Sequence, residues 1–117
     1  MTGLREGSFP GKCRLRKSND FRRVFAHGRR RVTRYFVIYT LPNRLEVSRI
    51  GIQIRRKIGT AVTRNRLKRM VRELFRRMKG DFREPMDMIL IAETGMPGLK
   101  RTDFEAAFRG ALQGVTK

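Results

Sequence analysis

The chain has 117 residues, 39% of them hydrophobic, so it has the length of one domain and can bury a modest core. Its 29 Lys and Arg residues outnumber its 10 Asp and Glu residues, and the formal net charge is +19. A charge of this size attracts a phosphate polyanion and destabilises the isolated compact chain through self-repulsion. The composition therefore favours a nucleic-acid partner, and it argues against a membrane protein because no segment approaches the roughly 20 apolar residues of a span.

Cys13 and His27 are the only cysteine and the only histidine. One cysteine cannot form a disulfide within the chain, and one Cys with one His cannot complete a zinc site. We interpret Cys13 as a free thiol without a special role. The sequence shows no charged start followed by an apolar segment, the pattern of a secretion signal, so we expect a cytoplasmic protein.

The first elements are an arm and a short helix. Residues 1–13 are rich in glycine and predict a flexible N-terminal arm, and we expect residues 14–117 to form a single domain. Ser18 is placed to cap a helix over residues 19–26, which Gly28 ends. The apolar residues of this helix share one face: Phe21, Val24 and Phe25.

Three segments predict β-strands. The β-branched and aromatic run 35–41 follows the basic run 29–31, and the segment 49–55 alternates between isoleucine and polar residues. One face of that second strand is therefore polar and cationic, with Arg49, Gln53 and Arg55. The apolar run 86–92 predicts a buried strand, and Gly and Pro residues mark a loop after it.

A long helix after the second strand is apolar on one side and cationic on the other. Its apolar residues recur with helical spacing and predict a face buried against the sheet: Leu67, Met70, Val71, Leu74, Phe75 and Met78. The basic residues occupy the opposite side and its flanks, and Glu73 is the only acid between Arg55 and Lys79. A solvated helix face usually mixes charges of both signs. This unbalanced face therefore indicates an anionic partner.

The last helix has its own start signal. Thr102 and Glu105 have the spacing of a capping box. The apolar face of this helix comprises Phe104, Phe108, Ala111, Leu112 and Val115. The element order α-β-β(-β)-α-β-α, with the third strand left open, predicts an α+β fold in which helices pack on a small mixed sheet.

Two stretches resemble the protein subunit of bacterial ribonuclease P. The first runs from Arg14 to Gly28 and on into Phe36-Val-Ile-Tyr39, and the second runs from Ile50 to Phe75. The second stretch includes the Arg64-Asn65-Arg66 signature. The C-terminal third matches mainly in the order of its strand and helix.

The resemblance implies a compact α+β fold with a left-handed βαβ crossover around the basic helix. It also implies a protein that joins a catalytic RNA and assists endonucleolytic removal of the 5′ leader of precursor tRNA, with no protein partner required. The hydrolysis would belong to the RNA with divalent metal, Mg²⁺ in the holoenzyme, and the protein itself would need no cofactor and no catalytic residue. The scattered carboxylates agree with this, since no pair has an obvious metal-binding spacing.

By the same resemblance, two surfaces carry the function. The long helix would contact the catalytic RNA through Arg64, Asn65, Arg66, Lys68, Arg69, Arg72 and Arg76. Asn65 is a candidate to help order a metal ion shared with the RNA. A cleft between the first helix and the sheet would hold the single-stranded leader with Phe21, Phe25, Tyr39, Gln53, Arg55, Arg56 and Lys57. Aromatic rings stack on unpaired bases while cations follow the backbone.

Other interpretations remain open from the residues alone. Phe21 and Phe25 also fit plain core packing, as do most helical aromatic pairs. A ribosomal or other structural RNA-binding protein has similar size and charge, and a DNA-binding architectural protein is a third possibility. Cofractionation with ribosomes, nucleoid or a single RNA would distinguish these classes.

Overall fold

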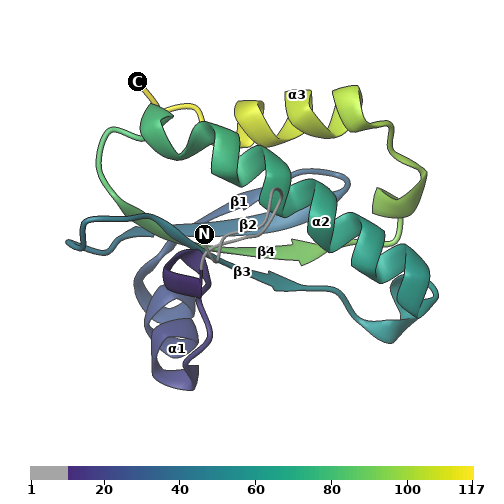
Figure 1. Ribbon diagram of the computed structural model, residues 1–117, viewed down its shortest axis with the longest axis horizontal. Helices are drawn as coiled ribbons and strands as arrows, with labels where there is room; N and C mark the ends of the chain where they lie inside the picture. Colours follow the sequence, from purple (N-terminus) through teal and green to yellow (C-terminus); the bar gives the residue numbers. More distant parts are fainter. Residues whose placement is uncertain (1–10) are drawn as a thin grey trace, which may run out of the picture.

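The computed structural model of the protein describes residues 11–117 and has the expected α+β architecture (Figure 1). The optional third strand is present. In chain order the elements are α1 (Ser18–His27), β1 (Arg29–Val32), β2 (Phe36–Pro42), β3 (Arg49–Gln53), α2 (Ala61–Met78), β4 (Met86–Ala92) and α3 (Arg101–Ala111).

The strands form one mixed sheet in the order β1-β2-β4-β3. β2 pairs antiparallel with both β1 and β4, and β3 pairs parallel with β4. Parallel neighbours need a long connection, which α2 supplies between β3 and β4. The left-handed sense of this βαβ crossover stays a prediction from the resemblance.

Helices cover both faces of the sheet, α2 and α3 on one and α1 on the other (Figure 1). Residues alternate between the faces along each strand. In β2, Phe36 and Ile38 face the main core under α2 and α3, where Phe36 meets Phe104 at a ring-centroid distance of 5.6 Å. Tyr39 belongs to a smaller cluster under α1 with the buried Ile89. The α1 side of the sheet is therefore separate from the main core.

α2 buries the face that its spacing predicts. All six predicted residues are at most 6% exposed: Leu67, Met70, Val71, Leu74, Phe75 and Met78. Burying each of these side chains contributes roughly 1.5–3 kcal/mol. The helix begins at Ala61, three residues before Arg64, because the Thr60 hydroxyl accepts a bond from the Thr63 amide at 3.2 Å. Its outer side is thereby fixed relative to the sheet.

Two predicted helix starts are wrong. Ser18 is the first residue of α1 and Lys17 is its N-cap, without a side-chain hydrogen bond. Lys100 likewise precedes α3 without a side-chain cap, so Thr102 and Glu105 form no capping box.

The N-terminal boundary also differs. Residues 11–13 form a 3₁₀ turn, and Cys13 is fully buried in the main core. The fold therefore begins before residue 14, the start that the sequence predicts. The rest of the predicted arm, residues 1–10, lies outside the described residues.

Candidate nucleic-acid interface

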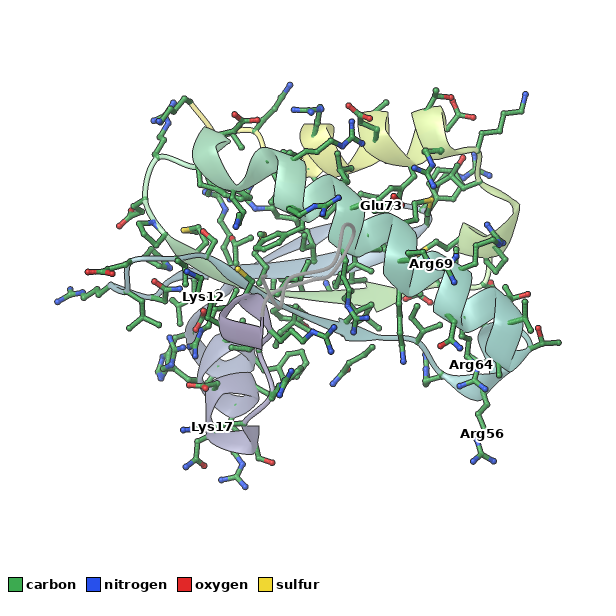
Figure 2. All side chains as sticks on the ribbon, in the orientation of Figure 1. Lys12, Lys17, Arg56, Arg64, Arg69 and Glu73 are labelled. Carbon is green, nitrogen blue, oxygen red and sulfur yellow. The ribbon has the colours of Figure 1, made fainter. Side chains whose placement is uncertain are left out.

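The outer side of α2 carries a row of predicted site residues, here called the α2 stripe: Arg64, Asn65, Arg66, Lys68, Arg69, Arg72 and Arg76. Four of them are exposed (Asn65, Arg66, Arg69 and Arg76), and the other three are half-buried. In Figure 2, Arg64 and Arg69 are labelled along the helix and Arg56 on the segment before it. One helix therefore brings the predicted RNA-subunit residues together.

The acids near α2 are paired away from the stripe. Glu73 lies 3.3 Å from Arg101 of α3, and Arg77, on the flank of α2, lies 3.4 Å from Glu105 of α3. Within residues 11–117, five members of the stripe form no ion pair: Arg64, Arg66, Lys68, Arg69 and Arg76. Their charges are available to an external anion.

Two guanidinium groups of the stripe are held in place by backbone oxygens. Arg64 Nε donates to the carbonyl oxygen of Gly59 at 3.2 Å, and Arg66 Nη2 donates to that of Pro97 at 3.1 Å. Each group keeps further N–H donors for a ligand. Because these groups are already held, less side-chain freedom would be lost on binding an anion.

Arg14 and Arg16 extend the stripe, although the sequence analysis did not select them as site residues. Leu15 donates a backbone hydrogen bond to Ile50 at 3.0 Å, so this segment runs beside β3. Burial lowers the pKa of Arg72, and the positive charges of Arg14 and Arg16 lower it further. Two chain segments, residues 14–16 and α2, thus concentrate positive charge at one place. No local pattern shows this, because only the sheet brings residues 14–16 to α2.

On the α1 side of the sheet, the aromatic groove is a shallow depression of about 450 Å³ lined by Arg16, Ser18, Phe21, Arg22, Phe25 and Gln53. The Phe25 side chain is 38% exposed, and its ring meets Tyr39 edge-on at a centroid distance of 4.9 Å. Phe21 is half-buried, with its ring centroid 6.4 Å from that of Phe25. The two phenylalanines therefore pack on the sheet and also present ring surface to solvent.

The structure brings only some of the predicted leader residues together. Phe21, Phe25 and Gln53 line the aromatic groove, and Tyr39 does not line it but contacts Phe25 edge-on. The basic residues Arg55, Arg56 and Lys57 are exposed but follow the end of β3 and do not line the groove. They lie between β3 and α2, in the connection that leads to the α2 stripe.

A buried carboxylate holds α1 on the sheet. Asp87 of β4 is fully buried and accepts two hydrogen bonds from Arg49, at 2.8 and 2.7 Å, and one from Asn43 at 2.9 Å. Arg23 of α1 also donates to it. Burial raises the pKa of Asp87, but these hydrogen bonds outweigh burial and leave the pKa below its usual range. The single acid within an apolar strand was the signal available in the sequence, since a buried charge needs partners.

The described residues do not form a metal site by themselves. Within residues 11–117, no three His, Cys, Asp or Glu side chains are grouped so that they could hold an ion. Asn65 offers one amide oxygen on an exposed helix surface. In the same part of the chain, no helix has the length and apolar character needed to cross a membrane.

The fold and its site define a small α+β protein in which a mixed sheet carries a basic helix on one face and an aromatic groove on the other. Residues 9–116 match the family model described as Ribonuclease P. The chain belongs to this family, the protein component of bacterial ribonuclease P, which is a ribonucleoprotein of tRNA processing.

Relatives and solved structures agree along most of the chain. The ribonuclease P protein component of Thermotoga maritima is 41% identical over 98 residues, 83% of this chain and 84% of the relative. That of Syntrophus aciditrophicus is 38% identical over 90 residues, 77% of this chain and 76% of the relative. The Staphylococcus aureus RNase P protein superposes with a TM-score of 0.81 at 30% identity and covers 90% of this chain and 98% of its own.

Proposed function

We propose that this protein binds the catalytic RNA of ribonuclease P through the α2 stripe and the single-stranded 5′ leader of precursor tRNA through the aromatic groove. It thereby assists removal of the leader at the mature 5′ end. Arginine and lysine contacts to phosphates fix the register of the protein on the RNA without reading its sequence. Ring stacking accepts any base, so the groove suits leaders of different sequence.

The observation that carries the proposal is the continuity of the two surfaces. Arg16 lines the aromatic groove, and its charge acts on Arg72 of the α2 stripe. One RNA assembly can therefore contact both surfaces, and an unpaired strand leaving the α2 side meets exposed rings and cations. A protein that bound only folded RNA would have no need of exposed rings in such a groove.

The chemistry belongs, in this proposal, to the RNA with its divalent metal. Asp87, the one fully buried carboxylate in the described chain, is occupied by two arginines and an asparagine. Asp20 pairs with Arg23 and Arg49, and Glu73 pairs with Arg101. Each of these acids has a basic partner within the fold. Among the residues that the structure describes, no three His, Cys, Asp or Glu side chains are grouped to hold an ion, so in this proposal Asn65 contributes alongside RNA ligands.

A reconstitution tests the proposal. The protein is mixed with a bacterial ribonuclease P RNA and a precursor tRNA at low magnesium concentration, where the RNA alone is slow. Cleavage at the mature 5′ end should accelerate, and the gain should be larger for a precursor with a long leader. A protein that binds the RNA but does not change cleavage would contradict the assignment.

A further inference from the structure

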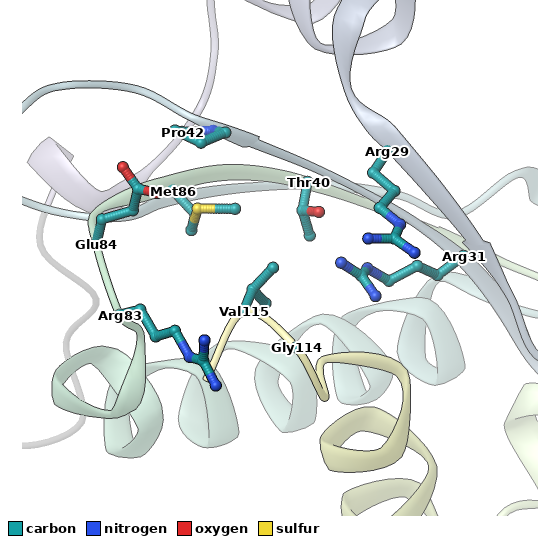
Figure 3. Close-up of a pocket in the computed structure, with 9 residues that line it drawn as sticks. All are labelled: Arg29, Arg31, Thr40, Pro42, Arg83, Glu84, Met86, Gly114 and Val115. Atoms are coloured by element: carbon teal, nitrogen blue, oxygen red, sulfur yellow. The ribbon is translucent and has the colours of Figure 1, made fainter. Parts of the chain in front are cut away.

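A second basic pocket lies on the opposite face of the sheet from the aromatic groove. It has a volume of about 180 Å³ and lies between the edge strand β1, its neighbour β2 and the turn after α3. Figure 3 shows Arg29, Arg31 and Thr40 at one end, Arg83 and Glu84 at the other, and Val115 between them. The space exceeds what a single water molecule needs.

Two polar atoms of this pocket lack a partner. Thr40 is 2% exposed, and its hydroxyl makes no hydrogen bond to any residue the structure describes. Arg31 Nε is likewise buried and unbonded among these residues, while Nη1 of the same guanidinium donates to the Gln113 carbonyl oxygen at 3.3 Å. An unsatisfied buried polar group costs about 1–3 kcal/mol. Such groups call for a ligand with hydrogen-bonding atoms.

The positive charge of Arg29 and Arg31 indicates the kind of ligand that this pocket would bind. Arg29 and Arg31 are paired with Thr40 and Ile38 of β2, so both side chains lie on the α3 side of the sheet. Figure 3 shows their guanidinium groups close together. Burial lowers the pKa of Arg31, and the charge of Arg29 lowers it further. Water could satisfy the two free polar atoms, but only an anion offsets two neighbouring guanidinium charges.

We propose that Arg29, Arg31 and Thr40 form a binding site for a phosphate group. The Arg31 Nε–H and the Thr40 hydroxyl donate to its oxygens, and Arg29 closes the site from the solvent side. Planar guanidinium groups match tetrahedral oxyanions with two parallel hydrogen bonds. The phosphate is either a free anion or a phosphodiester of an RNA strand that passes the β1 edge.

This site is independent of the proposed function. The α2 stripe and the aromatic groove use neither Arg31 nor Thr40, and the groove lies on the other face of the sheet. The sequence also offers a matched control. Arg30 pairs with Tyr39 and lies on the α1 side, so Arg30→Gln removes the same charge from the same strand but on the other face.

Site-resolved NMR titration tests the inference, because a chain of charge +19 attracts phosphate at many places. Inorganic phosphate is added at constant ionic strength, with chloride as the reference. The Arg31 Nε–Hε and Thr40 signals should shift and saturate. A short single-stranded RNA with hydroxyl ends is the second arm, since it offers only phosphodiesters. Saturation with both ligands assigns an RNA backbone contact, and saturation with phosphate alone assigns a free anion.

Variants decide whether the named residues form the site. Arg31→Gln should weaken phosphate binding by at least about tenfold, because a charge-assisted hydrogen bond is lost. Binding to this variant is followed through the NMR signals of Thr40 and Gly114. Thr40→Val, which keeps the shape, should weaken binding severalfold, and Arg30→Gln should leave it unchanged. Linear shifts without saturation would mean an adventitious ion only. That result, or equal effects of Arg30→Gln and Arg31→Gln, would overturn the proposal.

Discussion

The ring of Phe21 on α1 lies directly against Gly51 on β3. A Cβ added at Gly51 would stand 2.5 Å from the Phe21 Cζ atom and 2.9 Å from Cε1, closer than atoms can approach. Gly51 is itself buried beneath the Phe21 ring, and it pairs with Ile89 of β4. The missing side chain therefore sets the depth at which α1 rests on the sheet.

Gly51→Ala should push the Phe21 ring out of its position and lower stability by about 1–3 kcal/mol, as overpacking does. Urea unfolding measures the loss, and binding of a long-leader precursor reports the damaged groove. Gly110→Ala on α3 is the control, because its added Cβ meets no atom within 4 Å and alanine favours a helix. If Gly51→Ala were as stable as the parent protein, Phe21 would not be held as described.

Arg69→Gln should weaken assembly with the catalytic RNA and reduce the slope of log affinity against log salt by about one unit, since one phosphate contact is lost. Filter binding across a salt series measures both quantities. Arg109→Gln on α3 removes the same charge from a residue already paired with Glu105 and Asp81. Equal effects of the two changes would mean that only net charge matters.

Phe25→Ala should lower affinity for precursor tRNA by roughly 1–3 kcal/mol if the exposed ring stacks on a leader base. Assembly with the catalytic RNA should not change. The loss should disappear with a leader too short to reach the aromatic groove, so affinities are compared over a series of leader lengths. A uniform loss at every length would assign Phe25 to packing against Tyr39 alone.

Asp87→Asn should cost stability near the low end of about 3–5 kcal/mol, because it leaves Arg23 and Arg49 without their buried partner while both remain partly open to solvent. The folded pKa of Asp87 lies below the unfolded value. Its contribution to stability is therefore complete above the unfolded pKa and is lost as the pH falls through the folded pKa.

Urea midpoints measured from neutral pH into the acid range test this dependence. The parent protein should lose stability on acidification below the ordinary carboxyl range, near pH 4. Asp87→Asn should be weaker at neutral pH and show a flatter acid limb. Parallel curves for the two proteins would mean that another group controls the acid transition.

Amide substitutions at Asp20, Glu46 and Glu73 should leave single-turnover cleavage by the reconstituted holoenzyme near normal, because the RNA and its metal perform the hydrolysis in the proposed function. Saturating protein removes any effect on assembly. Glu73→Gln should cost no more than about 1 kcal/mol of stability, since its ion pair with Arg101 is at the surface. If the single-turnover cleavage rate of a folded variant fell by several orders of magnitude, the protein would carry catalytic residues.

Periodic patterns predicted the parts of the fold that local physics controls. The 3.6-residue spacing from Leu67 to Met78 identified the buried side of α2, and the apolar run Met86–Ala92 identified β4. The opposite side of α2, which carries the α2 stripe, follows from the same spacing. The sequence leaves one strand optional and does not place it, and the basic run Arg29-Arg30-Arg31 carries no strand pattern. This run lies in β1, which forms as an edge strand on β2, where such residues can stay largely exposed.

The parts that could not be predicted depend on contacts between distant segments. Arg16 comes to the aromatic groove and toward Arg72 only because residues 13–15 run along β3. The partners of Asp87 come from α1, β3 and the loop between β2 and β3, as far as 64 positions away in the chain. No pattern within one element contains such information.

The two edge strands of the sheet, β1 and β3, affect self-association of the protein. An uncovered edge strand offers free N–H and C=O groups to any other extended chain. The Arg14–Leu15 segment covers part of the β3 edge, and the three consecutive arginines of β1 would repel a second copy. Joining two β1 strands would bring six guanidinium groups together without an acid between them. The charge that recruits a polyanion thus also opposes self-association through the sheet, so the protein can remain dispersed until nucleic acid neutralises it.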